Sequence, residues 1–370
     1  MGLRSGLPRL LAALLLGLGL LVATPATAAA EPAPTQSPLV KGEPVFGERL
    51  VAGAGRWDTT DLTFGYQWLR AAEPVPGATG RTYDLGLDDL GRRISVEVTA
   101  TDSAGYSTTV RSEPTERVRR APLQVRTAPG VAGVTRFGRT VRVTLGDVRP
   151  APRVQRVRWR VGGKLVAGER GRTYRLRPGD VGRNVRADVR LTAPGHTTVR
   201  LRTAPRRVEH RVGVRRTVTY SVQTRGRITT SLATFRRQAQ ETYADARGWR
   251  GGGVRFVPVR RGGSFTLVLA AAGEVPTFHP ICSAQWSCRV GRYVVINQER
   301  WKHASPAWNA ARGALRDYRH MVVNHETGHW LGRGHASCGG AGQLAPVMQQ
   351  QSKGLGGCRF NPWPTVRELR

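Results

Sequence analysis

Three histidines and one glutamate near the C-terminal end of the sequence have a spacing that suits metal binding. His325, His329 and His335 follow the pattern H-E-x-x-H-x-x-G-x-x-H, with Glu326 after the first histidine and Gly332 between the last two. On a helix, positions i and i+4 lie on one face, so the first two imidazoles could reach one tetrahedral ion. Gly332 would let the chain leave the helix with a positive φ and return the third histidine to that ion.

The ligand set also predicts what the ion would do. Three neutral histidines leave one coordination position open, which is typical of a catalytic rather than a structural zinc. Glu326 lies one step round the helix, where its carboxylate could reach a water on the ion rather than the ion itself. The pattern therefore predicts one catalytic Zn²⁺, with Glu326 as general base and proton shuttle.

The extended motif resembles that of the metzincin zinc peptidases, in which a methionine turn follows it. In the sequence Pro346-Val347-Met348, the methionine lies thirteen residues after His335. The resemblance therefore implies that Met348 forms the base under the metal. It further implies a secreted endopeptidase that hydrolyses peptide bonds with a zinc-bound water and Glu326. An edge strand that pairs with extended substrate is expected at residues 293–296. No tyrosine follows Met348 closely, so a tyrosine ligand of the astacin type is not expected.

A wider stretch carries a second resemblance. Residues 216–364, including 294–297, 346–351 and 358–364, resemble an actinobacterial secreted domain of unknown function. Enzymatic activity in that domain is inferred rather than established.

The elements around the motif predict an α+β domain over residues 216–370. A strand pattern at 217–222 precedes an amphipathic helix that Ser231 could cap and that runs to about Arg247. Short apolar strands are expected at 254–259, 265–270 and 293–296, and a second helix from about 311 to 331 carries the motif. Two helices against a small sheet give an α+β layout.

All four cysteines lie in this domain, which suits an oxidising compartment. Of three connectivities, the pairs Cys282–Cys288 and Cys338–Cys358 are favoured because each closes a short loop that contains glycine or serine. A zinc ribbon is the competing interpretation, but the sequence has no C-x-x-C pair. The pair Cys338–Cys358 would tie the segment after His335 to the segment after Met348 and so fix both relative to the ion.

An internal repeat at an offset of 91 residues precedes this domain. The matching landmarks are Phe46-Gly47 with Phe137-Gly138, Trp68 with Trp159, residues 80–83 with 171–174, and residues 89–92 with 180–183. Period-two apolar runs between turn residues predict an all-β sandwich for each copy, over 41–118 and 121–209. The first copy, through 66–68, 77–83 and 89–96, resembles the immunoglobulin-like repeats of secreted actinobacterial surface proteins.

The charge of the chain is concentrated in the second repeat. The formal net charge is +33, and residues 115–220 hold 27 basic and 6 acidic side chains, whereas residues 38–113 hold 8 and 11. Such a basic repeat could bind an anionic cell-wall polymer. The alternative is an ordinary solvated surface whose arginines reflect a GC-rich genome. The sequence alone favours this alternative. Nucleic acid is not an expected partner because no aromatic residues interleave with the charges.

The first thirty residues predict an export signal. Arg4 and Arg9 precede an apolar stretch at 10–22, and A-x-A cleavage sites occur at 26–28 and 28–30. Thirteen apolar residues are too few to span a bilayer, which needs about 20, although an uncleaved anchor is the alternative. Residues 31–40 are expected to be a Pro-rich spacer, and no later stretch is apolar enough for a transmembrane segment. The expected location is extracellular or on the cell surface.

Together these observations predict a multidomain protein: two immunoglobulin-like repeats followed by a metzincin-like zinc peptidase domain. Two other functions stay open. A cell-envelope binding or adhesion protein could carry a structural or degenerate zinc site, although it would have no need for the carboxylate of Glu326. A zinc-dependent peptidoglycan amide hydrolase would use the same residues. The sequence identifies neither the substrate preference, nor a mode of activation, nor the oligomeric state.

Overall fold

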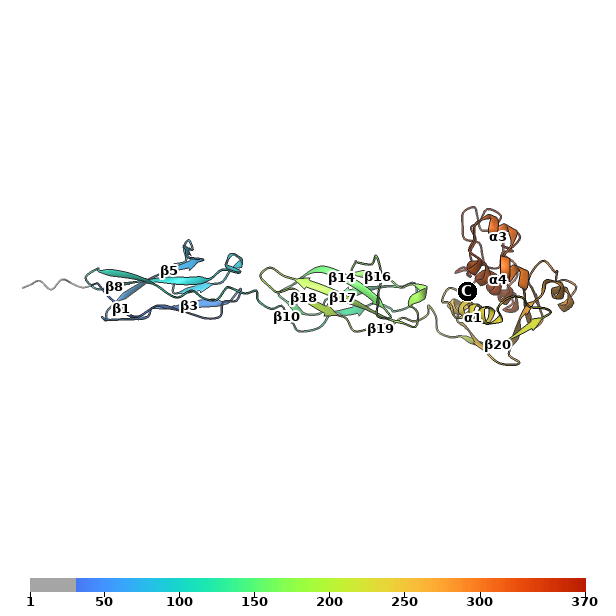
Figure 1. Cartoon of the computed structure of the whole chain (residues 1–370), viewed down its shortest axis with the longest axis horizontal. Helices are drawn as coiled ribbons and strands as arrows, with labels where there is room; N and C mark the ends of the chain where they lie inside the picture. The colour runs from blue at the N-terminus through green and yellow to red at the C-terminus, as the bar shows by residue number, and fades with distance from the viewer. Residues whose placement is uncertain (1–30) are drawn as a thin grey trace, which may run out of the picture. The chain divides into compact units, whose positions relative to one another are not determined.

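The computed structural model describes residues 31–370, so the predicted signal peptide at 1–30 lies outside the described residues. The chain divides into two compact units, Met1–Ala121 and Pro122–Arg370. In Figure 1 the first unit contains a module of blue strands, and the second contains a module of green strands and a domain with helices, coloured yellow to red. None of the helices in residues 31–370 has the length and apolar character needed to cross a membrane.

The first module is a β-sandwich of short antiparallel strands. Its sheets have the orders β2-β3-β7 and β6-β5-β8-β9, and β1 pairs with β4. The strands are β1 (Pro34–Gln36), β2 (Leu39–Lys41), β3 (Arg49–Gly53), β4 (Arg56–Trp57), β5 (Thr63–Arg70), β6 (Glu73–Pro74), β7 (Thr82–Asp84), β8 (Ile94–Thr101) and β9 (Ser107–Arg111). Period-two burial, as at Ile94, Val96, Val98 and Ala100, places one face of each sheet in the core.

Residues 31–40 do not form the spacer that the prolines suggested. They contribute β1 and β2, and Leu39 pairs with Gly53 of β3. The backbone N–H of Ala33 also donates to the carboxylate of Asp58 at 2.9 Å. Proline is tolerated in edge strands because it lacks only a donor that such a strand can leave unpaired. The first module therefore starts near residue 33 rather than at 41.

The second module repeats this sandwich. Its sheets have the orders β11-β12-β16 and β15-β14-β17-β18, β19 also pairs with β17, and β10 pairs with β13. The strands are β10 (Gln124–Val125), β11 (Gly130–Ala132), β12 (Thr140–Thr144), β13 (Val148–Arg149), β14 (Arg153–Val161), β15 (Lys164–Leu165), β16 (Thr173–Arg175), β17 (Asn184–Thr192), β18 (Val199–Arg202) and β19 (Arg206–Arg207). The predicted all-β sandwich repeats are confirmed by this strand pairing.

Each module is built around the same buried aromatic pair. Trp68 and Trp159 are fully buried, and they stack on Tyr83 and Tyr174 with ring centroids 5.5 and 5.6 Å apart. The indole N–H of each tryptophan donates to a backbone carbonyl twelve residues later, at 2.8 and 3.0 Å. The 91-residue offset in the sequence is therefore an offset between equivalent core positions.

The C-terminal domain has a five-stranded mixed sheet of order β21-β20-β22-β24-β23, with β23 antiparallel to β24 and the other pairs parallel. Its elements are β20 (Arg216–Arg225), α1 (Leu232–Ala244), β21 (Val254–Pro258), β22 (Phe265–Ala270), β23 (Cys288–Val290), β24 (Tyr293–Asn297), α2 (Gln298–His303), α3 (Pro306–Ala310) and α4 (Leu315–Trp330). Ser231 caps α1 as predicted, because its hydroxyl accepts from the Thr234 N–H at 3.2 Å. The mixed α/β character of this domain agrees with the predicted layout.

The motif helix packs in the middle of this domain. Tyr243 of α1, Phe265 of β22 and Met321 of α4 belong to one buried core. The indole N–H of Trp249 donates to the Asn324 carbonyl at 2.9 Å, one residue before the first histidine of the motif. These contacts fix the position of α4 relative to α1 and the sheet.

Two details differ from the sequence prediction. The helix expected from 311 begins at Leu315, because the chain after α3 passes through a positive φ of 56° at Arg312. The strand at 293–296 is not at the sheet edge, since β24 lies between β22 and β23. The segment after the cysteine loop folds back as an antiparallel hairpin and makes β23 the edge strand.

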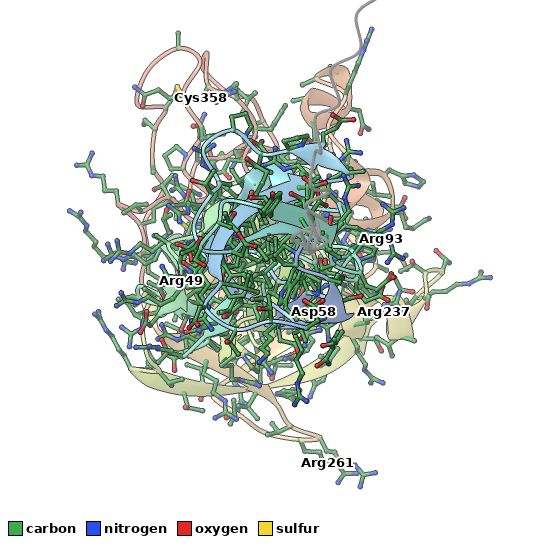
Figure 2. The ribbon with its side chains drawn as sticks, turned by 90° about the vertical axis from the view of Figure 1, so that its left-hand side faces the viewer. Arg49, Asp58, Arg93, Arg237, Arg261 and Cys358 are labelled. Carbon is green, nitrogen blue, oxygen red and sulfur yellow. A yellow bond between two sulfur atoms is a disulfide. The ribbon has the colours of Figure 1, made fainter. Side chains whose placement is uncertain are left out.

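Figure 2 draws the side chains as sticks and labels two arginines of the C-terminal domain, Arg237 of α1 and Arg261 of the loop between β21 and β22. Both residues are exposed.

Candidate metal centre

The structure brings the three histidines of the motif together. His325 and His329 extend from one face of α4, and the chain then leaves the helix at Gly332 with φ +88°. His335 returns to the same point: its Nε2 lies 3.1 Å from Nε2 of His329, which lies 3.2 Å from Nε2 of His325. Such a group of ligand atoms could hold a metal ion.

Hydrogen bonds to carbonyl groups set the tautomer of two of these rings. Nδ1 of His325 lies 2.8 Å from the carbonyl oxygen of Val347, and Nδ1 of His329 lies 2.8 Å from that of Arg333. A carbonyl oxygen only accepts, so each Nδ1 carries the proton and each Nε2 presents a lone pair. Burial lowers the pKa of His325 to about 3 and also lowers the pKa of His329, which keeps both rings neutral.

The arrangement of these lone pairs fits a divalent cation. Two unprotonated nitrogens at this separation have no proton to share and repel each other. A tetrahedral zinc, with bonds of about 2.0–2.1 Å, places its nitrogen ligands about 3.3–3.4 Å apart. The observed separations of 3.1 and 3.2 Å are close to that value. Neutral imidazole nitrogens are also ligands that zinc prefers.

Glu326 lies on the buried side of α4 and lines the same pocket as the three histidines. Its residue surface is only 6% exposed. Burial raises the pKa of its carboxyl to about 8, against the opposite effect of the Arg289 guanidinium. A nearby divalent cation would favour the charged form of this carboxyl.

The methionine turn lies directly under the motif helix. Met348 is buried, and a Cβ added at Gly328 would overlap its sulfur and the ring of Trp249, so this helix position requires glycine. The Met348 carbonyl accepts from the Ala336 N–H at 3.1 Å, next to the third histidine. Together with the bond from His325 to the carbonyl of Val347, this joins residues 346–348 to the helix and the loop that carry the three histidines.

A carboxylate from the end of the chain holds this turn. Glu368 accepts hydrogen bonds from the backbone N–H groups of Val347 and Met348 at 3.1 and 2.8 Å. It also accepts from the N–H and hydroxyl of Thr365 at 2.7 and 2.8 Å. No spacing in the sequence relates Glu368 to the motif, so sequence reasoning missed it.

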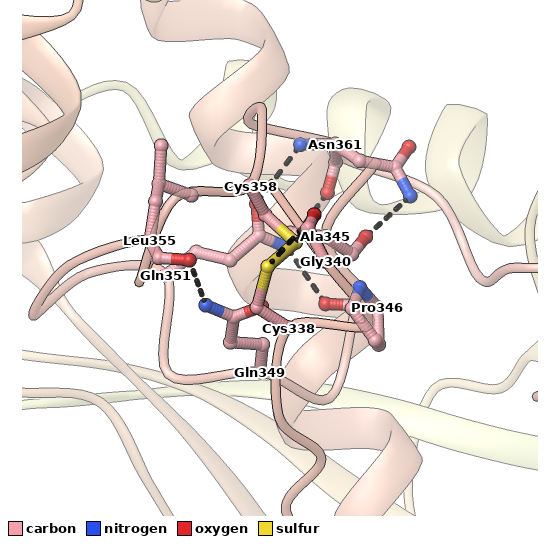
Figure 3. The surroundings of a disulfide bond; sticks show 9 residues. All are labelled: Cys338, Gly340, Ala345, Pro346, Gln349, Gln351, Leu355, Cys358 and Asn361. Atoms are coloured by element: carbon pink, nitrogen blue, oxygen red, sulfur yellow. Dashed lines mark hydrogen bonds between the residues drawn. A yellow bond between two sulfur atoms is a disulfide. The ribbon is translucent and has the colours of Figure 1, made fainter. Parts of the chain in front are cut away.

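Both predicted disulfide pairs are confirmed, as Cys282–Cys288 and Cys338–Cys358. The second pair lies among buried amides that brace the segment after the methionine turn (Figure 3). Gln351 donates to the carbonyls of Pro346 and Asn361 at 3.0 and 2.8 Å, and its own amide oxygen accepts from the Asn361 N–H at 2.9 Å.

The three histidines of the candidate metal centre line a pocket of about 450 Å³. One wall comes from the loop of the first disulfide and from β23, and another from residues 350–353. Arg289 and Lys353 bring positive charge to these walls, and Arg289 donates to the His329 carbonyl at 2.9 Å. Neither cation was identified from the sequence, because each is adjacent to the motif only in the folded chain.

A comparison with known protein families matches most of the C-terminal domain together with the last strands of the second module. Residues 191–361 match the family described as "Protein of unknown function (DUF3152)". The matched range includes the three histidines, Glu326 and Met348, and the description assigns no activity. No curated protein matches the chain.

Solved structures match the N-terminal half. The three N-terminal domains of the outer capsid protein Hoc of bacteriophage RB49 are 13% identical, with a TM-score of 0.23 and coverage of 51% of this chain and 64% of that one. A Ca²⁺-stabilised adhesin with which an Antarctic bacterium binds ice is 15% identical, with a TM-score of 0.23 and coverage of 50% of this chain and 51% of that one. The tandem Ig repeats of Dlar are 16% identical, with a TM-score of 0.17 and coverage of 49% of this chain and 99% of that one. This chain thus spans about two thirds of the length of the capsid protein structure and about half of the length of the adhesin structure. The two sandwiches are defined by the strand pairing of this chain itself.

Residues 191–361 of this chain are therefore similar to the DUF3152 family, and His325, His329 and His335 within them could bind a metal ion.

Proposed function

We propose that the chain is an extracellular zinc-dependent endopeptidase. His325, His329 and His335 would hold the ion, and Glu326 would be the general base. The observation that carries this proposal is the convergence of three imidazole nitrogens, at 3.1 and 3.2 Å, in one pocket with a buried carboxyl group. A site that only held an ion would have no use for that carboxyl group. Two disulfides support a location in an oxidising compartment.

The roles of the residues follow from their surroundings. A zinc ion in the site would act as a Lewis acid that polarises the scissile carbonyl and lowers the pKa of a water toward about 7. Glu326 would accept a proton from the attacking water and deliver it to the leaving nitrogen. Glu326 must be charged to accept that proton, and the cation would favour its charged form against the effect of burial. The carbonyls of Val347 and Arg333 would keep His325 and His329 oriented.

The edge strand next to the site suits an extended substrate. β23 pairs with β24 on one side, and Arg289 in its middle donates to the last turn of α4. A free strand edge can add a peptide strand through backbone hydrogen bonds. We therefore propose β23, rather than residues 293–296, as the strand that binds substrate.

A peptidoglycan amide hydrolase is a second candidate. Arg289 and Lys353 line the pocket beside the histidines, and their charges would suit a substrate with carboxylate groups near the scissile amide. Digestion of purified cell wall, compared with digestion of a peptide library, separates the two candidates.

The test of the proposed function combines metal analysis with a cleavage assay. The wild-type chain should contain about one zinc per molecule and cleave a denatured proteome. His329→Ala should lose the metal and the cleavage, whereas His303→Ala, a change at an exposed histidine outside the cluster, should keep both. A wild-type chain that binds no zinc, or a His329→Ala chain that cleaves normally, would overturn the proposal.

A further inference from the structure

The outer face of one sheet in the second module carries an array of arginines. Val157 and Trp159 of β14, and Ala187 and Val189 of β17, point into the core. Because side chains alternate along a strand, the residues between them point outward. The outward positions, here called the arginine face, are Arg156, Arg158 and Arg160 of β14, Arg186, Asp188 and Arg190 of β17, and Arg200 and Arg202 of β18.

The strand register places these side chains next to one another. Arg156 is opposite Arg190, which is opposite Arg200 on the next strand. Neighbouring strands are about 4.8 Å apart and alternate residues about 6.7 Å apart along a strand, so the charges form a grid with that spacing. Residues of this grid line a hollow of about 620 Å³.

The array is not neutralised by its one acidic residue. Asp188 pairs with Arg160 at 2.6 Å and with Arg202 at 3.5 Å. The Nε atoms of Arg186 and Arg190 are buried and have no hydrogen-bond partner within residues 31–370. Seven guanidinium groups around one carboxylate repel one another, which costs stability unless an anion binds.

The equivalent face of the first module lacks most of these charges. At the compared positions the register is the same at the offset of 91: Gln67 is opposite Glu97, as Arg158 is opposite Asp188. The ion pair Asp188–Arg202 has its counterpart in Glu97–Arg111, at 2.8 Å. The other six arginines replace uncharged residues of the first module: Gly65, Gln67, Leu69, Ser95, Thr99 and Thr109. A codon bias would act on both copies, so it does not explain a difference confined to one.

We propose that the arginine face binds a linear, base-free polyanion that presents phosphate groups along an extended chain, such as a phosphodiester-linked polymer of the cell surface. Guanidinium groups bind tetrahedral oxyanions through two hydrogen bonds each, and a grid of them can follow a flexible chain. Nucleic acid is disfavoured because none of the eight positions is aromatic, so the face offers no platform for bases.

The experiment measures binding of fluorescently labelled inorganic polyphosphate to the full chain over a range of salt concentrations. The triple variant Arg158→Gln, Arg190→Thr, Arg200→Thr carries the residues of the first module and leaves both partners of Asp188 in place. The control is Arg142→Gln, Arg172→Gln, Arg175→Gln, which removes the same charge from exposed positions at the other sheet of the module. Thermal unfolding of each variant confirms that it is folded.

The triple variant should bind at least tenfold more weakly at low salt. Its plot of log affinity against log salt should become shallower by about 2, at about 0.7 per lost contact. The control should bind within about threefold of wild type. Equal weakening in both variants would show that only net charge matters, and tighter binding of oligo(dT) or of anionic vesicles than of polyphosphate would assign the face to another partner. Either result overturns the proposal. The same binding measurements are made on chains that also carry Glu326→Gln, which removes the proposed general base. The result for the arginine face is then independent of the proposed hydrolase activity.

Discussion

At the scale of single residues, the candidate metal centre depends on groups that orient the histidines as much as on the histidines themselves. The carbonyls of Val347 and Arg333 fix two tautomers, and Glu368 holds the turn that supplies the first of these carbonyls. Such partners usually affect metal affinity by 10–100-fold. The site is therefore a network of hydrogen bonds with three ligands at its centre.

The contact between Gly328 and Met348 gives a first prediction. Gly328→Ala adds a Cβ that overlaps the Met348 sulfur, so we expect a loss of about 1–3 kcal/mol in the free energy of unfolding, as for other overpacked cores. Zinc affinity should fall too, because the displaced turn orients His325. Gly334→Ala is the matched control, since an added Cβ there meets nothing within 4 Å. Chemical denaturation and zinc titration measure both effects, and equal behaviour of the two variants would exclude the contact as a cause.

A buried histidine outside the cluster gives a prediction about pH. Burial, assisted by Arg316, lowers the pKa of His320, whose Nδ1 lies 2.8 Å from the Thr242 hydroxyl. The unfolded chain thus binds this proton more readily, and stability must fall as the pH falls below about 6.5. One such proton lowers the free energy of unfolding by up to about 1.4 kcal/mol per pH unit.

The measurement is urea denaturation of the metal-free wild type and of His320→Gln at pH 7.5 and 5.5. Wild type should lose more stability between the two pH values than the variant does. Parallel losses would show that His320 does not contribute.

The residues of the motif could be predicted from the sequence because a helix places i and i+4 on one face and a glycine ends it. Glu368, Arg289 and Lys353 could not, since they reach the site through long-range packing that no local pattern records.

At the scale of elements, the prediction of which strand lies at the sheet edge was wrong. Alternation and apolar content identified the strand at 293–296, but they did not show the three-residue strand β23, which is too short for a pattern. Its place at the edge depends on the hairpin that follows the Cys282–Cys288 loop. Strand existence was therefore predictable, whereas strand order was not.

The second disulfide joins two elements of the site and gives a further prediction. Cys338→Ala with Cys358→Ala opens a loop of 20 residues, for which we expect a loss of about 3 kcal/mol in stability. Zinc affinity should also fall, because the segment after His335 is no longer tied to the segment after Met348. Isothermal titration with zinc and denaturation measure these effects. In Cys282→Ala with Cys288→Ala, which opens a loop of only six residues and releases neither the segment after His335 nor the segment after Met348, zinc affinity should change less. Unchanged zinc affinity in the first variant would remove this role.

At the scale of the whole molecule, two copies of one scaffold carry different surfaces. The aromatic pairs at Trp68 and Trp159 keep the same core, which is why the repeat was visible in the sequence. The charge difference was also visible there, but the grid was not, since it requires the register of β14, β17 and β18. An anion-binding module before a hydrolase domain would hold the enzyme at an anionic surface.

The most direct test of the proposed function is zinc content and peptide cleavage measured on the same preparations of wild type and Glu326→Gln. Glutamine has nearly the same shape as glutamate but cannot accept a proton from water at neutral pH. We expect both chains to contain about one zinc, and the variant to cleave at least 1000-fold more slowly, within the range of about 10²–10⁴-fold that positioned acid–base groups contribute. A zinc-loaded variant that cleaves as fast as wild type would contradict the assignment of Glu326 and with it the proposed hydrolase.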